Sequence, residues 1–155
     1  MRIDILSAVP KLLDSWFGES ILQRAQDKGL VQIKVHDLRD WSTDKHRRLD
    51  AAPFGGGAGM VMSVEPIHRA IEHLKSERTY DEVIYMSPDG ELLDQALTNQ
   101  LSLKGNLILL CGHYKGVDER VRENLITREI SIGNYVLSGG ELAAAVLSDS
   151  IIRLI

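Results

Sequence analysis

The chain has 155 residues, of which 44% are hydrophobic and one is cysteine. This length fits a single domain with a sizeable core. The lone thiol of Cys111 excludes an internal disulfide and favours a cytoplasmic protein. A formal net charge of −4 argues against a surface built for non-specific nucleic-acid binding, although a local basic patch remains compatible with it. No apolar stretch is long enough to span a membrane, so we expect no membrane partner.

The first half of the chain alternates between apolar runs and helical patterns. We expect a strand at 3–6, helical sequence through 12–28, and a half-buried strand at 31–35. A polar loop at 37–50 follows, and then a helix at 65–77 with Pro66 in its first turn.

The second half continues the alternation. We expect a strand at 83–86 that ends at the turn sequence 87–90, a helix at 92–103, and a buried strand at 106–111. A short helix at 117–125, a strand at 129–130 and a helix from 141 to the end of the chain complete the series. In the last helix the apolar pattern still runs at 151–155 without a stop signal, so we expect the natural protein to continue. This alternation predicts an α/β fold with a mostly parallel sheet flanked by helices.

Two glycine-bearing loops near the C-terminal end are the strongest functional signal. The first, residues 111–120, follows the buried strand at 106–111, and the second, residues 131–141, follows the strand at 129–130. Loops at the carboxyl ends of strands bind ligands in open α/β sheets, and glycine lets the main chain approach a ligand closely. Each loop carries a tyrosine, so together they predict a pocket that stacks on a flat ring and hydrogen-bonds through the main chain. Cys111 ends a buried strand, so we expect a small core residue rather than a nucleophile.

A third loop, residues 53–60, has four glycines in five residues. It is no P-loop, because no Gly-Lys-Ser/Thr follows, and it lacks the strand and third glycine of a dinucleotide fingerprint. It is either a flexible loop or a backbone surface that lies against something flat. The basic run 45–48 is equally compatible with a solvated loop and with phosphate contacts. The histidines and the single cysteine show no zinc-binding spacing, so we expect no structural metal.

Together these motifs resemble the bacterial tRNA (guanine-N1)-methyltransferase family, which belongs to the SPOUT class of knotted methyltransferases. The matching residues run in the right order along nearly the whole chain: 44–46, 53–60, 85–88, 93–95, 111–114, 116–120 and 131–141. The resemblance implies a deep trefoil knot in the last part of the domain, which no propensity argument would propose. It also implies S-adenosylmethionine as methyl donor, tRNA as substrate, and a homodimer with the active site at the subunit interface.

The resemblance also assigns residues. The cofactor would be held by Tyr85, Met86, Ser87, Pro88, Gly112, Tyr114, Ile132, Gly133, Asn134, Tyr135, Val136, Leu137, Gly139 and Gly140. The tRNA would be contacted by Lys45, Arg47, Arg48, Gly55, Gly56, Gly57 and Gly59. Arg153 matches the family arginine that stabilises negative charge on the guanine O6 as N1 loses its proton; without the resemblance it would be read as a surface residue of a helix.

Some features depart from the family pattern. Lys115 stands where glutamate is usual, which reverses a charge beside the cofactor and puts any magnesium-assisted role of that position in doubt. Asn134, Ala51 and Ala143 replace a common Asp, Asp and Pro. The family carries a second, tRNA-gripping domain, and its linker supplies the general base. We therefore expect these 155 residues to bind cofactor but to methylate weakly or not at all.

Two other functions remain open at this point. A non-enzymatic RNA-binding module with a vestigial pocket would keep the fold without the chemistry. A nucleotide-binding α/β protein would use the glycine loop for phosphate, although the missing Lys-Ser/Thr pair weighs against it.

Overall fold

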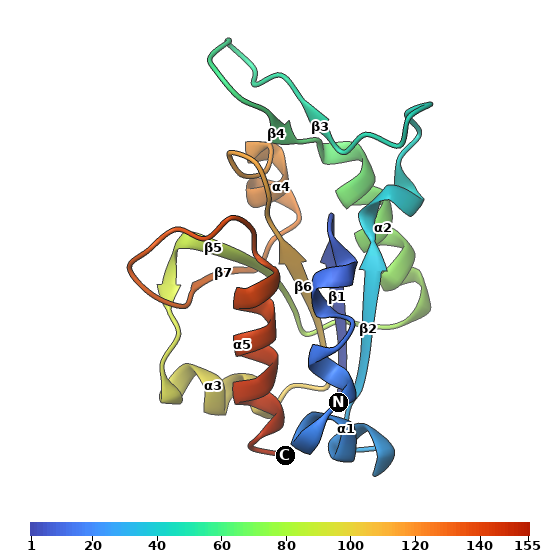
Figure 1. Ribbon diagram of the computed structural model, residues 1–155, viewed down its shortest axis with the longest axis vertical. Coiled ribbons are helices and arrows are strands. Elements are labelled where there is room, and N and C mark those ends of the chain that lie inside the picture. The colour runs from blue at the N-terminus through green and yellow to red at the C-terminus, as the bar shows by residue number, and fades with distance from the viewer.

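The computed structural model describes all residues from Met1 to Ile155. Its main feature is a five-stranded sheet in the order β2-β1-β6-β5-β7, in which every neighbouring pair is parallel. The strands are β1 (Arg2–Ser7), β2 (Gln32–Asp37), β5 (Glu82–Leu92), β6 (Asn106–Cys111) and β7 (Arg128–Ser131). A separate antiparallel pair, β3 (Asp50–Ala51) and β4 (Val61–Met62), forms a hairpin that projects at the top of Figure 1. The prediction of a mostly parallel α/β sheet is confirmed.

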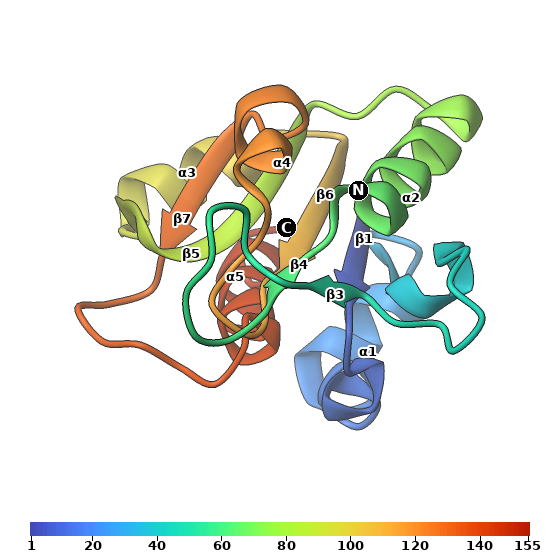
Figure 2. The same ribbon diagram turned by 90° about the horizontal axis from the view of Figure 1, so that it is seen from above.

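Helices cover both faces of this sheet, as Figures 1 and 2 show. One face packs α1 (Ser20–Asp27), α3 (Gln95–Ser102) and α5 (Glu141–Ile152), and the other packs α2 (Val64–Glu77) and α4 (Glu119–Asn124). Side chains alternate between the two faces along each strand. In β6, Leu107 and Leu109 join the α5 side, whereas Ile108 and Leu110 join the α2 side. Each strand buried on both faces therefore reads as a continuous apolar run.

The first helical region differs from the expectation. Instead of one helix at 12–28, the chain forms two short 3-10 turns, Pro10–Leu13 and Trp16–Gly18, and then α1 from Ser20. The chain enters α1 through Ser20, whose φ of +55° is a left-handed conformation that a continuous α-helix does not contain. A further 3-10 turn, Leu38–Trp41, lies inside the expected polar loop, and Asp37 caps it by accepting a hydrogen bond from the Arg39 N–H.

Capping side chains set the starts of two other helices later than the apolar pattern indicates. The Asp94 carboxylate accepts a 2.8 Å hydrogen bond from the Leu97 N–H, so α3 begins at Gln95. The Asp118 carboxylate accepts one of 3.0 Å from the Arg120 N–H, so α4 begins at Glu119. Both follow the preference for aspartate at the N-cap. The last helix, α5, does not run to the end of the chain as expected. It stops at Ile152, and residues 153–154 form a turn.

No helix combines the length and the apolarity needed to cross a membrane.

Candidate functional site

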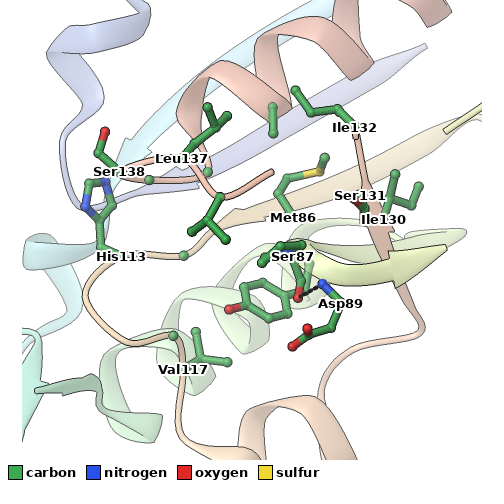
Figure 3. Close-up of a pocket in the computed structure, with 18 of the residues that line it drawn as sticks. Met86, Ser87, Asp89, His113, Val117, Ile130, Ser131, Ile132, Leu137 and Ser138 are labelled. Atoms are coloured by element: carbon green, nitrogen blue, oxygen red, sulfur yellow. Dashed lines mark hydrogen bonds between the residues drawn. The ribbon is translucent and has the colours of Figure 1, made fainter. Parts of the chain in front are cut away.

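A cavity of about 270 Å³ opens at the carboxyl ends of β5, β6 and β7 (Figure 3). Three separate segments line it: residues 85–89, residues 112–117 and residues 130–140, with one residue each from α4 and α5. Its volume lies just below the roughly 300–1,000 Å³ that is usual for small-molecule sites. The site lies where open parallel sheets generally bind ligands, at the carboxyl edge of the strands.

The first segment is a bulge in β5. The sequence predicts that this strand ends at 87–90, and this is wrong, because β5 continues to Leu92. Met86 and Glu91 both pair with Ile130 of β7, so the four residues between them are looped out of the ladder. The Asp89 N–H donates a 3.2 Å hydrogen bond to the Ser87 Oγ inside this bulge. Gly90 is required here, since a Cβ would lie 2.5 Å from main-chain atoms of β7.

The second segment is the loop after β6, which rests on the ring of Tyr85. A Cβ at Gly112 would lie 2.9 Å from both Cε2 and the hydroxyl of Tyr85, so only glycine allows this approach. Tyr85 is buried in β5, and burial raises the pKa of its phenol. The loop turns through left-handed backbone at Tyr114 and Gly116, with φ of +58° and +111°. It is tied to the β4 region because the Lys115 N–H donates to the Met60 carbonyl.

The third segment, residues 130–140, runs back across the first two. It is anchored where the Gly140 N–H donates a 2.9 Å hydrogen bond to the Gly112 carbonyl. Its middle exposes apolar surface, with Tyr135 and Val136 56% and 81% accessible. The Ser131 hydroxyl donates a 2.9 Å hydrogen bond to the Gly133 carbonyl, which holds the first turn. The cavity is therefore walled by apolar side chains and by main-chain groups at glycines.

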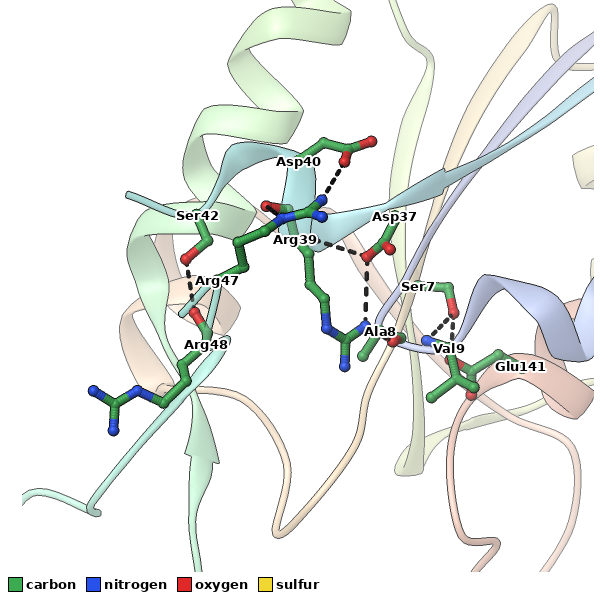
Figure 4. Close-up of polar contacts among 10 residues, drawn as sticks. All are labelled: Ser7, Ala8, Val9, Asp37, Arg39, Asp40, Ser42, Arg47, Arg48 and Glu141. Atoms are coloured by element: carbon green, nitrogen blue, oxygen red, sulfur yellow. Dashed lines mark hydrogen bonds and ion pairs between the residues drawn. The ribbon is translucent and has the colours of Figure 1, made fainter. Parts of the chain in front are cut away.

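A buried polar cluster supports the second and third segments from behind. The Glu141 carboxylate, at the first turn of α5, lies 2.7 Å from the His113 Nε2 and accepts a 2.5 Å hydrogen bond from the Ser7 hydroxyl. His113 lines the cavity, whereas Glu141 and Ser7 do not. Figure 4 shows Ser7 and Glu141 beside the end of β1.

The glycine loop of residues 53–60 joins β3 to β4 and lies against the second segment. All four of its glycines have positive φ, from +86° to +113°, which a side chain rarely tolerates. At Gly59 a Cβ would lie 2.6 Å from the Cε of Lys115, so the lysine stem packs on this glycine. Phe54 at the tip is fully exposed. The main chain of this loop is thus open to a ligand beside the cavity.

The basic run at 45–48 is partly neutralised by acidic neighbours. Arg47 lies 2.6 Å from the Asp40 carboxylate (Figure 4), and Arg48 lies 3.3 Å from the partly exposed carboxylate of Asp44. Lys45 forms no ion pair. Exposed pairs of this kind contribute little to stability, so both arginines remain available to phosphates.

The chain matches the family described as tRNA (Guanine-1)-methyltransferase TrmD over residues 1–155. The chain belongs to this family. It is 66% identical to the tRNA (guanine-N(1)-)-methyltransferase of Flavobacterium psychrophilum and 62% identical to that of Bacteroides fragilis. Each comparison covers all of this chain and 69% of the relative. The structure is similar to a crystal structure of tRNA (m1G37) methyltransferase from Aquifex aeolicus, with a TM-score of 0.92 and 35% identity, over the whole chain and 70% of the other.

Most residues that the methyltransferase resemblance assigns to a cofactor come together in this cavity. All of them line it except Asn134. Ten further residues line the cavity that the assignment did not include: Asp89, His113, Lys115, Gly116, Val117, Arg122, Ile130, Ser131, Ser138 and Ala143. Most belong to the highlighted loops, but Arg122 and Ala143 come from helices that only the tertiary structure brings to the cavity. Arg122 is held there by Glu129, whose carboxylate hydrogen-bonds its guanidinium at 2.7 Å and raises its pKa.

Arg153 lies outside this cavity. It follows the last turn of α5, is exposed, and is separated from the pocket by a helix about 18 Å long. The start of α5 lines the cavity through Ala143, and Figure 1 shows the helix running from there to the other end of the sheet, where the C-terminus lies. Within a single chain, Arg153 does not reach the cavity.

The chain contains no cluster of three or more His, Cys, Asp or Glu side chains that could hold a metal ion. Cys111 is fully buried, and burial raises the pKa of its thiol well above its usual value. The prediction that it is a core residue is confirmed.

Proposed function

We propose that the chain binds S-adenosylmethionine in the cavity and transfers its methyl group to N1 of a guanine in tRNA, at position 37 next to the anticodon. The observation that carries this proposal is the convergence of three distant segments on one cavity in a member of the tRNA (guanine-N1)-methyltransferase family. A relative of the same fold bears the name tRNA (m1G37) methyltransferase.

The lining of the cavity fits this donor. Val117, Ile132 and Leu137 supply apolar walls for an adenine ring, and main-chain groups at the glycines supply its hydrogen bonds. Gly112 has no room for a Cβ on its Tyr85 side, so the main chain itself forms this part of the wall. The donor supplies a methyl group already activated on a sulfonium.

The chain's own task is then alignment and charge. Guanine N1 must meet the methyl carbon in line, and a rigid cavity supplies that orientation. We propose that the glycine loop at Gly55–Gly59 receives the target nucleotide, because its open main chain borders the cavity and an extruded base needs such a pocket. Lys45, Arg47 and Arg48 would contact tRNA phosphates.

Lys115 places a cation at the rim of the cavity. Its ammonium is no metal ligand, and no cluster of acidic side chains surrounds it, so these residues do not fit a bound magnesium ion.

Negative charge that spreads to the guanine O6 as N1 loses its proton needs a cation or N–H donor nearby. In our proposal Arg153 supplies it, as the resemblance implies.

Arg153 can do this only from a second copy of the chain. The outer face of α5 and the turns after β1 expose Leu12, Trp16, Leu142 and Val146, each at least 41% accessible. The turn Pro10–Leu13 packs on α5, and exposed apolar side chains grouped on packed elements are typical of an interaction surface. We therefore propose a homodimer in which Arg153 of the partner subunit completes the site.

We also propose that the chain carries the SPOUT-type trefoil knot. The supporting observation is that residues 131–140 return to the loop after β6, where Gly140 hydrogen-bonds Gly112, although β5 separates β6 from β7 in the sheet.

Two measurements test the proposed function. Calorimetric titration with S-adenosylmethionine and its demethylated product should give micromolar binding with one site per chain. Methyl transfer to a tRNA with guanine at position 37 should then be measured for residues 1–155 and for the longer Flavobacterium relative. We expect weak transfer by residues 1–155, because the resemblance places the general base outside them, and full transfer by the relative.

Each alternative outcome has a definite meaning. Absence of donor binding, together with tRNA binding, would support the RNA-binding module with a vestigial pocket. Appreciable turnover by residues 1–155 would refute the assignment of the base to a segment outside them. A tRNA with adenine at position 37 serves as the control, and methylation of it would refute the proposed specificity.

A further inference from the structure

The Glu141 carboxylate is the most completely buried charged group at the rear of the cavity, with 1% of its surface accessible. Each of its oxygens has one partner. Oε2 lies 2.7 Å from His113 Nε2, and Oε1 accepts a 2.5 Å hydrogen bond from the Ser7 hydroxyl. A buried carboxylate without any partner would cost several kcal/mol, so both contacts offset part of that cost and contribute to stability.

These contacts join three elements that are far apart in sequence. Ser7 ends β1, His113 is in the loop after β6, and Glu141 starts α5. The Ser7 oxygen is itself fixed, because the Val9 N–H donates a 2.9 Å hydrogen bond to it. The carboxylate also benefits from the positive end of the α5 dipole, since it is in the first helical turn. It is therefore a fixed point against which the loop after β6 is held.

The space around the pair is filled. A Cβ at Gly139 would lie 2.4 Å from the His113 Nε2 and 2.6 Å from the Glu141 Oε2. The His113 ring thus has no alternative position on that side while the segment 131–140 is in place. Because the Gly116 N–H donates a 3.0 Å hydrogen bond to the His113 carbonyl, the position of His113 also sets the turn that carries Tyr114 and Lys115.

We propose that Glu141 is a positioning residue of the cofactor pocket. It does not line the cavity, but it holds His113, which does, and through His113 it holds residues 112–116 in the conformation that receives the donor. Ser7 binds the other carboxylate oxygen but neither lines the cavity nor contacts the loop after β6 through that bond. This inference rests on the proposed donor binding.

The test compares substitutions on either side of the carboxylate. Glu141→Met keeps the length of the side chain and removes both acceptors, so we expect donor affinity to fall about tenfold or more, as for loss of one charge-assisted hydrogen bond. Glu141→Gln still accepts from His113 and should recover most of the affinity. Ser7→Ala removes the contact on the far side and serves as the matched control, with affinity within about threefold of the unaltered chain.

A double-mutant cycle separates positioning from a general loss of stability. His113→Phe removes the partner through which Glu141 acts, so Glu141→Met should have no further effect on donor affinity in that background. A merely structural role predicts equal losses in both backgrounds. Affinity of Glu141→Met within twofold of the unaltered chain would overturn the proposal.

A second readout needs no ligand. Amide hydrogen exchange at Gly116 and Gly140 reports whether the loop stays closed, since both N–H groups donate within the second and third segments. Glu141→Gln and Ser7→Ala should leave this exchange slow, and Glu141→Met or His113→Phe should speed it at least tenfold. If the unaltered chain binds no donor, the proposed function fails while the exchange data still decide the positioning role. If Glu141→Met does not fold, unchanged exchange in His113→Phe would overturn the proposal.

Discussion

The packing of Gly140 against the main chain of β6 predicts a large effect of one methyl group. In Gly140→Ala the new Cβ would lie 2.8 Å from the Cys111 Cα and 2.9 Å from the Gly112 nitrogen. These are main-chain atoms at the end of β6, which cannot rotate away as a side chain does. Carbon atoms pack at about 3.5–4.0 Å, so the start of α5 and the end of β6 must separate by about 0.7 Å.

Two costs follow from this separation. Overpacking of a well-packed site costs about 1–3 kcal/mol. The Gly140 to Gly112 hydrogen bond, now 2.9 Å, would stretch beyond useful length and lose about 1 kcal/mol more. We therefore expect the free energy of unfolding to fall by about 2–4 kcal/mol, and donor affinity to fall because the third segment moves away from the second.

The assay is urea unfolding followed by circular dichroism, with calorimetric titration of the donor on the folded protein. Gly18→Ala is the control, because Gly18 is exposed and a Cβ there meets nothing within 4 Å. It should leave stability unchanged or raise it by about 0.4–1 kcal/mol through the unfolded state. A Gly140→Ala variant whose unfolding free energy and donor affinity match those of Gly18→Ala would refute the reasoning.

Three further predictions follow from charge and burial. Lys45 has no ion-pair partner, so Lys45→Ala should reduce the slope of the logarithm of the tRNA association constant against the logarithm of salt concentration by about 1. An unchanged slope would show that Lys45 makes no phosphate contact. Asp4 is fully buried, and although burial raises its pKa, hydrogen bonds from His36, Arg2 and Tyr80 outweigh this and hold the pKa well below its usual range. Its contribution to stability is therefore present above the unfolded pKa of about 3.9 and is lost as pH falls through the lower folded value. Asp4→Asn should lower the unfolding free energy near pH 7 by about 3–5 kcal/mol and should weaken the fall of the unfolding free energy at acid pH. The same fall at acid pH in the variant and the unaltered chain would contradict this. Cys111 is fully buried with a raised pKa, so iodoacetamide should alkylate it only in urea, and rapid alkylation of the native protein would show that the β6 end opens.

Local patterns predicted the order of elements well and their boundaries less well. The strand at 106–111 coincides with β6 because a run of buried apolar residues is flanked by turn residues on both sides. The predicted end of β5 was wrong. Ser-Pro-Asp-Gly has the composition of a turn, but pairing with β7 resumes after the bulge. A strand's length depends on its neighbour, and no local pattern contains that information.

For the candidate site too, local patterns predicted some features and only tertiary contacts set the others. The glycines at 112, 139 and 140 mark loops whose main chain must approach something closely, and their spacing after apolar runs places them at the carboxyl edge of the sheet. The chemical identity of the site came from the family resemblance and not from periodicity. The pairing of Arg122 with Glu129, and the contact of Glu141 with Ser7, were not predictable beforehand because the residues lie 7 and 134 positions apart and neither pair shares a helix.

The sequence by itself determined the α/β class, the buried strands and the positions of the glycine loops, because backbone preferences and side-chain burial act over a few residues. Only the tertiary structure decided which loops form one cavity, which glycine faces which side chain, and which buried carboxylate holds the loop after β6. Those choices depend on the order of strands in the sheet, and that order results from packing between segments far apart in the chain.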